Sequence, residues 1–231
     1  MPAAAPDVLI RGAGPVGCAL ALALADSNLR IKVVEKKPGH AGFRPITLSY
    51  ASRLILERVG GWEGLPVTPI DTILVSQAGG FGRTQMGAAD AGVPHLGYVL
   101  DYSALAAALR AKVSPFLIDK EVEPRCTVHA EGVARDAEET RYQQDAVVAL
   151  VKTEPPAEAP AYERFTAEGP LALLPLQGRY AVVWSASPQR AAQLAGMAEP
   201  EFLAALAGAG GAGARPPRPP GGPPGGPSRP P

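Results

Sequence analysis

Cysteine and histidine are scarce in this chain of 231 residues, and neither sign of charge is in excess. The two cysteines, Cys18 and Cys126, lie far apart and form no CxxC pair, which suggests neither a disulfide framework nor a zinc site. His40, His95 and His129 are isolated from other metal-binding side chains. Lysine plus arginine and aspartate plus glutamate number 22 each, so no basic surface attracts nucleic acid. We therefore expect a protein of a reducing compartment with no metal and no nucleic-acid partner.

Long apolar runs are also absent. No uninterrupted run approaches the ~20 residues that span a bilayer. The stretch GCALALALA at 17–25 is similar to the core of a signal peptide, but Asp7 and Arg11 precede it and glycines interrupt it upstream. The chain is 46% hydrophobic, which is enough for a core. We therefore expect a cytoplasmic globular protein that would meet a membrane only from outside.

The N-terminal residues follow a strand, turn, helix, strand pattern. An apolar run, DVLI at 7–10, is followed by GAGPVG at 12–17, an Ala/Leu-rich helix to about Asp26, and the run IKVVE at 31–35. Such a βαβ start predicts a parallel sheet with helices packed on it.

The later pattern changes from mixed to β-rich. Further helices are expected over 46–60 and 102–113. Runs typical of strands occur at 71–76, 145–151, 171–174 and 180–184. Proline and glycine separate the last of these, which favours an antiparallel region after the parallel one. The sequence therefore predicts an α/β fold.

The C-terminal residues 208–231 differ in kind from the rest of the chain. They consist almost entirely of glycine, proline, arginine and alanine, and cannot enter a core that would offset the entropy of ordering them. We expect this tail to be disordered. Three explanations stay open: a ligand of proline-binding grooves, a solvated tail, and the product of a frameshift in GC-rich coding sequence.

The glycines at 12–17 are spaced for a dinucleotide. Gly12 permits the tight turn, Gly14 lets the backbone approach a pyrophosphate, and Gly17 allows the helix to pack on the strand. Glu35 ends the second strand, where an acid accepts hydrogen bonds from ribose hydroxyls, although an ordinary strand-end carboxylate is the alternative. A free-standing carboxylate there would repel a 2′-phosphate, which favours FAD or NAD over NADP. Lys36 and Lys37 soften that exclusion slightly. Cys18 is predicted to be a buried structural thiol.

Several segments resemble the flavin-dependent aromatic hydroxylases of ubiquinone biosynthesis, the UbiH/UbiF type. The most specific is AYERFTAEGPLALLPL at 161–176, followed by YAVVWS at 180–185. Three further segments match in the same order, at 44–62, 95–109 and 142–151. The resemblance covers residues 7–206.

This resemblance implies a Rossmann-like FAD-binding region over 1–140, a β-rich substrate region over 141–207, and the tail over 208–231. It implies an FAD-dependent monooxygenase in which NAD(P)H reduces the flavin and O₂ supplies a hydroxyl group for a polyprenylated phenol. Such a substrate would bring peripheral contact at the inner face of the membrane and contact with other ubiquinone-biosynthesis proteins. No catalytic residue is assigned. The implied cofactor-binding residues are Gly12, Gly14, Pro15, Val16, Gly17, Glu35, Lys36 and Arg44.

The sequence departs from the family pattern in two places. The family's ADG segment corresponds to HAEGVARD at 129–136, where Glu131 replaces the aspartate. No Gly-Asp pair occurs in the sequence, although such a pair binds the flavin's ribityl chain in the family. We therefore expect a chain truncated at its C-terminus, with weak FAD retention and little hydroxylation. The alternatives are a noncatalytic fragment or interaction module, and an NAD-linked reductase, for which no catalytic Tyr-Lys or His-Asp set is seen.

Overall fold

The computed structural model describes residues 5–35, 42–132, 138, 140–157 and 160–211. The chain forms two compact units, each built from two segments: Met1–Val67 with Gly97–Arg141, and Thr68–Leu96 with Tyr142–Pro231. Within the described residues, no helix is long and apolar enough to cross a membrane.

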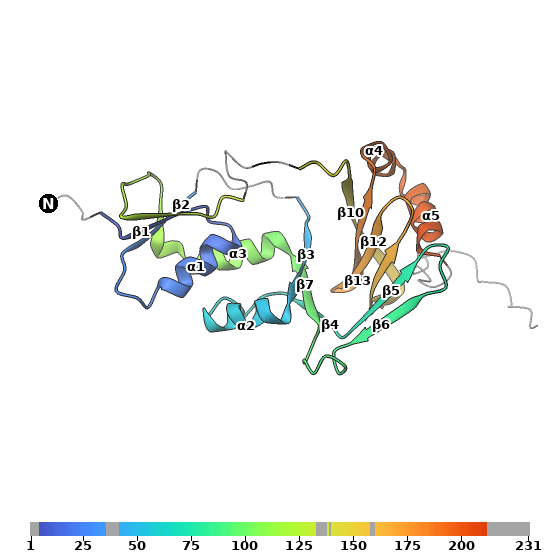
Figure 1. Ribbon diagram of the computed structural model, residues 1–231, viewed down its shortest axis with the longest axis horizontal. Helices are drawn as coiled ribbons and strands as arrows, with labels where there is room; N and C mark the ends of the chain where they lie inside the picture. Colours follow the sequence, from blue (N-terminus) through green and yellow to red (C-terminus); the bar gives the residue numbers. More distant parts are fainter. Residues whose placement is uncertain (1–4, 36–41, 133–137, 139, 158–159, 212–231) are drawn as a thin grey trace, which may run out of the picture. The chain divides into compact units, whose positions relative to one another are not determined.

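A four-stranded parallel sheet in the order β8-β2-β1-β9 organises the first unit. Its strands are β1 (Val8–Arg11), β2 (Ile31–Val34), β8 (Leu117–Ile118) and β9 (Cys126–His129), and the 3₁₀ turn Ser114–Phe116 precedes β8. Helices α1 (Pro15–Leu24) and α3 (Tyr102–Lys112) lie side by side next to β1 and β2 (Figure 1). Ile10, Val33 and Leu109 are fully buried between these elements. The βαβ start and the parallel sheet are thus confirmed.

An antiparallel pair of strands, β3 (Pro45–Ser49) and β7 (Gly97–Asp101), leads into the helices α2 (Tyr50–Arg58) and α3. The side chains of Ser49 and Asp101 accept hydrogen bonds from backbone N–H groups and so begin the two helices. The prediction of one helix over 46–60 was wrong at its start, because residues 46–49 form β3. Ile46 lies opposite Leu100, and no local pattern reports a partner so distant in sequence.

The second unit contains a six-stranded sheet in the order β10-β13-β12-β11-β5-β6. Its strands are β5 (Thr72–Gln77), β6 (Arg83–Gly87), β10 (Asp145–Ala157), β11 (Ala161–Phe165), β12 (Pro170–Leu176) and β13 (Gly178–Ala186), and the short β4 (Thr68–Ile70) contacts β12. Neighbouring strands are antiparallel except β11 and β5, which are parallel. The sequence interpretation grouped residues 68–96 with the FAD-binding region. The structure groups them with the later strands, because Ile73 on β5 lies opposite Ala161 on β11.

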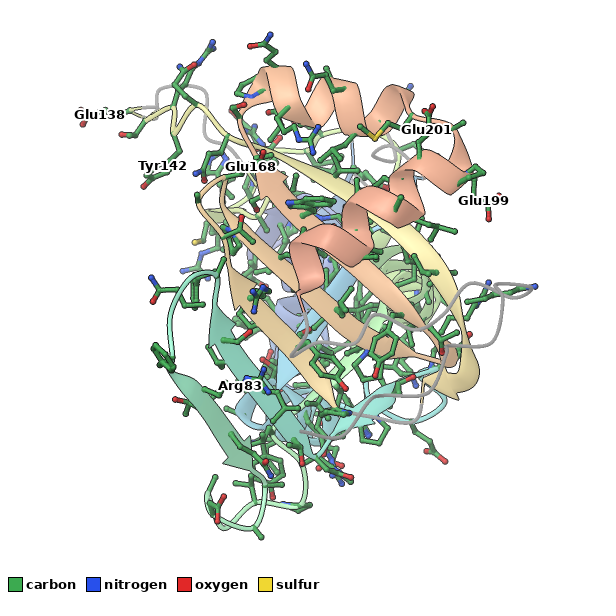
Figure 2. The ribbon with its side chains drawn as sticks, turned by 90° about the vertical axis from the view of Figure 1, so that its right-hand side faces the viewer. Arg83, Glu138, Tyr142, Glu168, Glu199 and Glu201 are labelled. Carbon is green, nitrogen blue, oxygen red and sulfur yellow. The ribbon has the colours of Figure 1, made fainter. Side chains whose placement is uncertain are left out.

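Helices α4 (Pro188–Gly196) and α5 (Glu199–Gly210) cover one face of this sheet (Figure 2). Beneath them Trp184, Leu194 and Leu206 are buried in the core of the unit. Neither helix was predicted from the sequence. The tail was expected to start at Gly208, and this was wrong, because α5 continues through Gly210. The prediction of a disordered tail otherwise falls on residues 212–231, which lie outside the described part of the chain.

Candidate functional site

The turn between β1 and α1 depends on two glycines for steric reasons. Gly12 has a φ of +105°, and a Cβ atom there would lie 2.4 Å from the carbonyl oxygen of Ala130. A Cβ atom at Gly17 would lie 2.0 Å from the carbonyl oxygen of Gly12. At Gly14, by contrast, the nearest atom is the Tyr102 hydroxyl oxygen at 3.5 Å. Gly12 and Gly17 therefore hold the turn against its neighbours, whereas Gly14 leaves space on the open side.

The N-terminus of α1 presents free hydrogen-bond donors to that space. Within the described residues no side chain caps the helix, and its first turn contains no acidic residue. Pro15 occupies the first helical position, where an N–H group would have no helical partner. The backbone N–H groups that follow and the positive end of the helix dipole attract an anion. A phosphate group is negatively charged and has several acceptor atoms, so it would complement this helix end.

A cavity of about 880 Å³ opens over the glycine turn. Six of the residues predicted to bind the cofactor line it: Gly12, Gly14, Pro15, Val16, Glu35 and Arg44. Gly17 is not among the lining residues and packs against Gly12 instead. Lys36 lies outside the described residues. The structure therefore brings together most of the predicted set, and cofactor binding by these residues stays a prediction.

Glu35 is not the free-standing carboxylate that the sequence suggested. Its Oε2 atom accepts a hydrogen bond from Nη1 of Arg110, on the last turn of α3, and the two side chains form an ion pair. The Glu35 side chain is 19% exposed, so this charge is compensated where water is limited. The pair leaves Oε1 of Glu35 to accept hydrogen bonds from a ribose. It also weakens the repulsion that a 2′-phosphate would meet.

Arg44 supplies a positive charge to the cavity wall. Its guanidinium group lies over the ring of Tyr102, 5.1 Å from the ring centroid, and its carbonyl oxygen accepts a hydrogen bond from the Tyr102 N–H at 2.8 Å. Cation–π contact orients the planar guanidinium. An arginine held in this way can donate two hydrogen bonds to one phosphate.

Strand β9 brings a second group of residues to the cavity. It pairs with β1 in parallel, so residues 129–132, at and beyond its carboxyl end, lie beside the glycine turn. The N–H of Ala130 donates to the carbonyl oxygen of Arg11 at 2.8 Å, and Nδ1 of His129 lies 3.1 Å from Oε2 of Glu131. Sequence comparison marked Glu131 only as a departure from the family pattern. The strand order reveals that this acid lines the cavity.

Cys18 lies behind the turn and takes no part in the cavity. It is fully buried, and its thiol donates a hydrogen bond to the carbonyl oxygen of Ala13 at 3.2 Å. Burial raises the pKa of the Cys18 thiol to about 11, so the reactive thiolate is disfavoured at neutral pH. The prediction of a buried structural thiol is confirmed.

Comparisons with known structures identify the fold. The chain aligns with PqsL from Pseudomonas aeruginosa, described as a probable FAD-dependent monooxygenase, with a TM-score of 0.70 at 19% identity over 88% of this chain and 66% of that one. It aligns with p-nitrophenol 4-monooxygenase PnpA from Pseudomonas putida with a TM-score of 0.64 at 14% identity, over 89% of this chain and 62% of that one. The chain has the fold of the FAD-dependent monooxygenases. A Klebsiella pneumoniae HpxO variant complexed with FAD shares it, with a TM-score of 0.65 at 15% identity over 87% of this chain and 62% of that one.

Sequence matches to curated proteins of this monooxygenase type are partial. Ubiquinone hydroxylase UbiM from Neisseria meningitidis is 37% identical over 71 residues, 28% of this chain and 15% of that protein. The mitochondrial ubiquinone biosynthesis monooxygenase COQ6 from Mus musculus is 42% identical over 71 residues, 30% of this chain and 15% of that protein. These matches support the resemblance to ubiquinone hydroxylases.

A match to a further protein extends over most of the chain. An uncharacterized protein of Synechocystis is 25% identical over 243 residues, which cover 87% of this chain and 58% of that protein. The chain thus spans less than two thirds of the length of the curated relatives it matches. No protein-family model matches it.

Proposed function

We propose that this chain acts as an FAD-dependent monooxygenase that hydroxylates the aromatic ring of a polyprenylated phenol in ubiquinone biosynthesis, with NAD(P)H as the reductant and O₂ as the oxidant. The observation that carries the proposal is the cavity over the glycine turn, in a chain with the fold of FAD-dependent monooxygenases. The partial matches to UbiM and COQ6 support the substrate class.

The residues of the cavity fit the adenosine and diphosphate half of FAD. When bound, FAD would supply the redox chemistry between NAD(P)H, O₂ and the aromatic ring. Gly14 and the helix end behind it would bind the pyrophosphate through backbone N–H groups. Oε1 of Glu35 would accept hydrogen bonds from the ribose, and the guanidinium of Arg44 would donate to a phosphate. Because the sequence contains no Gly-Asp pair for the ribityl chain, we expect the FAD affinity to be low.

An equilibrium titration suits such an affinity better than the flavin content of purified protein. The full chain is titrated with FAD up to about 1 mM, and binding is followed by flavin fluorescence. We expect saturable binding that ADP competes away, because ADP contains the half of FAD that the cavity fits. Failure of the wild-type chain to bind either ligand would contradict the proposal.

Two alanine variants distinguish a specific loss of FAD binding from the general effects of replacing a glycine. A Cβ atom at Gly14 would occupy the space left for the pyrophosphate, so we expect Gly14→Ala to weaken FAD binding at least about tenfold. Gly82→Ala is the matched control, because a Cβ atom there has no neighbour within 4 Å and the residue is not among those that line the cavity. It should bind FAD as the wild type does.

Hydroxylation itself is tested with a short-chain 2-prenylphenol, FAD, NADH or NADPH, and O₂. The expected product gains one oxygen atom, which mass spectrometry detects, and its formation should depend on the reductant. We further propose that a polyprenyl substrate brings the protein into peripheral contact with membranes and with other ubiquinone-biosynthesis proteins. Co-sedimentation with vesicles that contain the prenylphenol tests the membrane contact.

A further inference from the structure

Glu163 occupies the middle of β11, within the six-stranded sheet of the second unit. Its Cα atom pairs with that of Ala172 on β12 and with that of Val75 on β5. The residue therefore has a hydrogen-bonded strand on each side. A carboxylate at the centre of a sheet is unusual, because its neighbours there are normally apolar.

The alternation of β11 directs Glu163 away from the helices. Its neighbour Tyr162 packs into the core beneath α4 and α5, and its ring lies 5.9 Å from that of Tyr180. Successive side chains of a strand point to opposite faces, so Glu163 belongs to the face opposite Tyr162, which α4 and α5 do not cover. On that face the residues directly opposite it are Ala172 and Val75, so neither flanking strand offers a charged group at this register.

Glu163 has no hydrogen-bond or ion-pair partner among the residues that the structure describes. It is half-buried, and burial raises the pKa of its carboxyl group. The adjacent Arg164, on the other face, does have a partner, because its Nη1 donates to Oγ of Ser76 at 3.2 Å. A half-buried carboxylate without a partner costs stability, and groups retained at such a cost are frequently functional.

The surroundings of Glu163 restrict the chemistry of a ligand. A cationic ligand would gain an ion pair with the carboxylate but would give up its hydration beside alanine and valine, a cost that a neutral hydrogen-bond donor avoids. An aromatic ring suits this apolar surface, and the small side chain of Ala172 leaves room beside the carboxylate. The ligand that satisfies both conditions is an apolar ring with one neutral hydrogen-bond donor.

We propose that Glu163 contacts the substrate, and that its carboxylate accepts a hydrogen bond from the hydroxyl group of a phenol bound on this face of the sheet. The inference rests on the proposed function and names a residue of that reaction. The phenolic O–H bond can break toward Glu163, so that the proton moves to a carboxylate oxygen and the bonding electrons stay on the phenolate oxygen. A phenolate donates more electron density to its ring than a phenol, which favours attack by an electrophilic oxygen. A raised carboxyl pKa makes Glu163 a better acceptor for that proton.

A pair of probes isolates this hydrogen bond. The full chain is titrated by calorimetry with 2-prenylphenol and with its O-methyl ether, which has the same ring and tail but no donor. We expect the wild type to bind the phenol about tenfold more tightly than the ether, as a charge-assisted hydrogen bond provides. In Glu163→Ala the two affinities should agree within about twofold. Glu163→Gln, which keeps the shape of the side chain, should retain part of the preference and guards against a variant that does not fold.

Glu168→Ala is the matched control, because Glu168 lies on the turn between β11 and β12 and its side chain is 47% exposed (Figure 2). It should preserve the tenfold preference. The proposal is overturned if the wild type does not distinguish phenol from ether, or if Glu163→Ala distinguishes them as the wild type does. Binding of FAD without any effect of Glu163 would refute this inference and leave the proposed function intact. Absence of FAD binding would contradict the proposed function instead.

Discussion

A Gly17→Ala substitution would place a methyl group where helix α1 crosses the turn that precedes it. The new Cβ atom would lie 2.0 Å from the carbonyl oxygen of Gly12 and 3.3 Å from Cβ of Ala130. Side-chain carbons essentially never approach another heavy atom within 3.0 Å, so the turn or the helix has to move. Gly12 has little room to move away, because a Cβ atom built at Gly12 would already lie 2.4 Å from the carbonyl oxygen of Ala130.

The expected cost follows from this overlap with backbone atoms. Overpacking typically costs 1–3 kcal/mol, and contact with a backbone oxygen rather than a flexible side chain puts Gly17→Ala at about 2–3 kcal/mol. For a chain of this size that corresponds to a decrease in Tm of roughly 4–12 °C. Gly14→Ala should behave differently, because its nearest neighbour is 3.5 Å away and its φ of −71° suits alanine. The change at the helix cap costs under about 1 kcal/mol, and the loss of glycine's freedom in the unfolded chain offsets part of it.

Thermal unfolding followed by circular dichroism without ligand, together with the FAD titration, measures both effects. Gly17→Ala should lower Tm, whereas Gly14→Ala should keep a Tm close to that of the wild type and lose FAD affinity. A Gly17→Ala variant that melts at the wild-type temperature would contradict the overlap with the Gly12 carbonyl. A Gly14→Ala variant that loses as much stability as Gly17→Ala would show that the two glycines share one role.

Three further predictions concern stability. Trp184→Ala should lower the free energy of unfolding by about 3–5 kcal/mol in urea titrations, because the ring is 2% exposed in the core of the second unit. Trp184→Phe should lower it less, because the indole N–H that it removes has no partner among the described residues. Equal losses in the two variants would contradict this. Burial raises the pKa of Glu163 above its ordinary 4.5, so the folded state binds the proton more tightly than the unfolded state and wild-type stability should fall as pH rises above 4.5. Glu163→Gln should remove that loss and be more stable than the wild type at pH 7, and an unchanged pH profile would count against this. Hydrogen bonds from Arg30 hold the pKa of Asp7 well below its ordinary 3.8, so the pair stabilises the fold above pH 3.8 and this contribution is lost as the pH falls below that value. Asp7→Asn should therefore lose less stability than the wild type on acidification. Equal losses in both proteins would argue against a role of this pair.

The glycine turn could be predicted from the sequence because its requirements are local. Gly12 needs a positive φ within a turn of a few residues, and the strand and helix that flank it have their own periodic patterns. The βαβ start and most strands of the second unit were predicted for the same reason. The helix expected over 46–60 shows the limit, since β3 exists only because β7 lies beside it.

The members of the cavity other than the glycine turn depend on contacts between distant segments. Glu35 could be predicted from its place at the end of a strand, but its ion pair with Arg110 joins residues 75 positions apart. Glu131 lines the cavity because β9 is the neighbour of β1, and sequence order does not specify neighbours in a parallel sheet. The likeness to family segments pointed to these regions without describing their contacts.

Glu163 illustrates the same division in the second unit. The family-like segment marked residues 161–176 as important, yet gave the adjacent glutamate and arginine no separate roles. By itself the sequence determined the glycine turn and the alternation of the strands, because these depend on sterics and spacing within short segments. Only the tertiary structure decided which face of the sheet is covered by helices, which carboxylates have partners, and which strands lie side by side. Those properties depend on free energies of contact between segments far apart in the chain, which no local pattern contains.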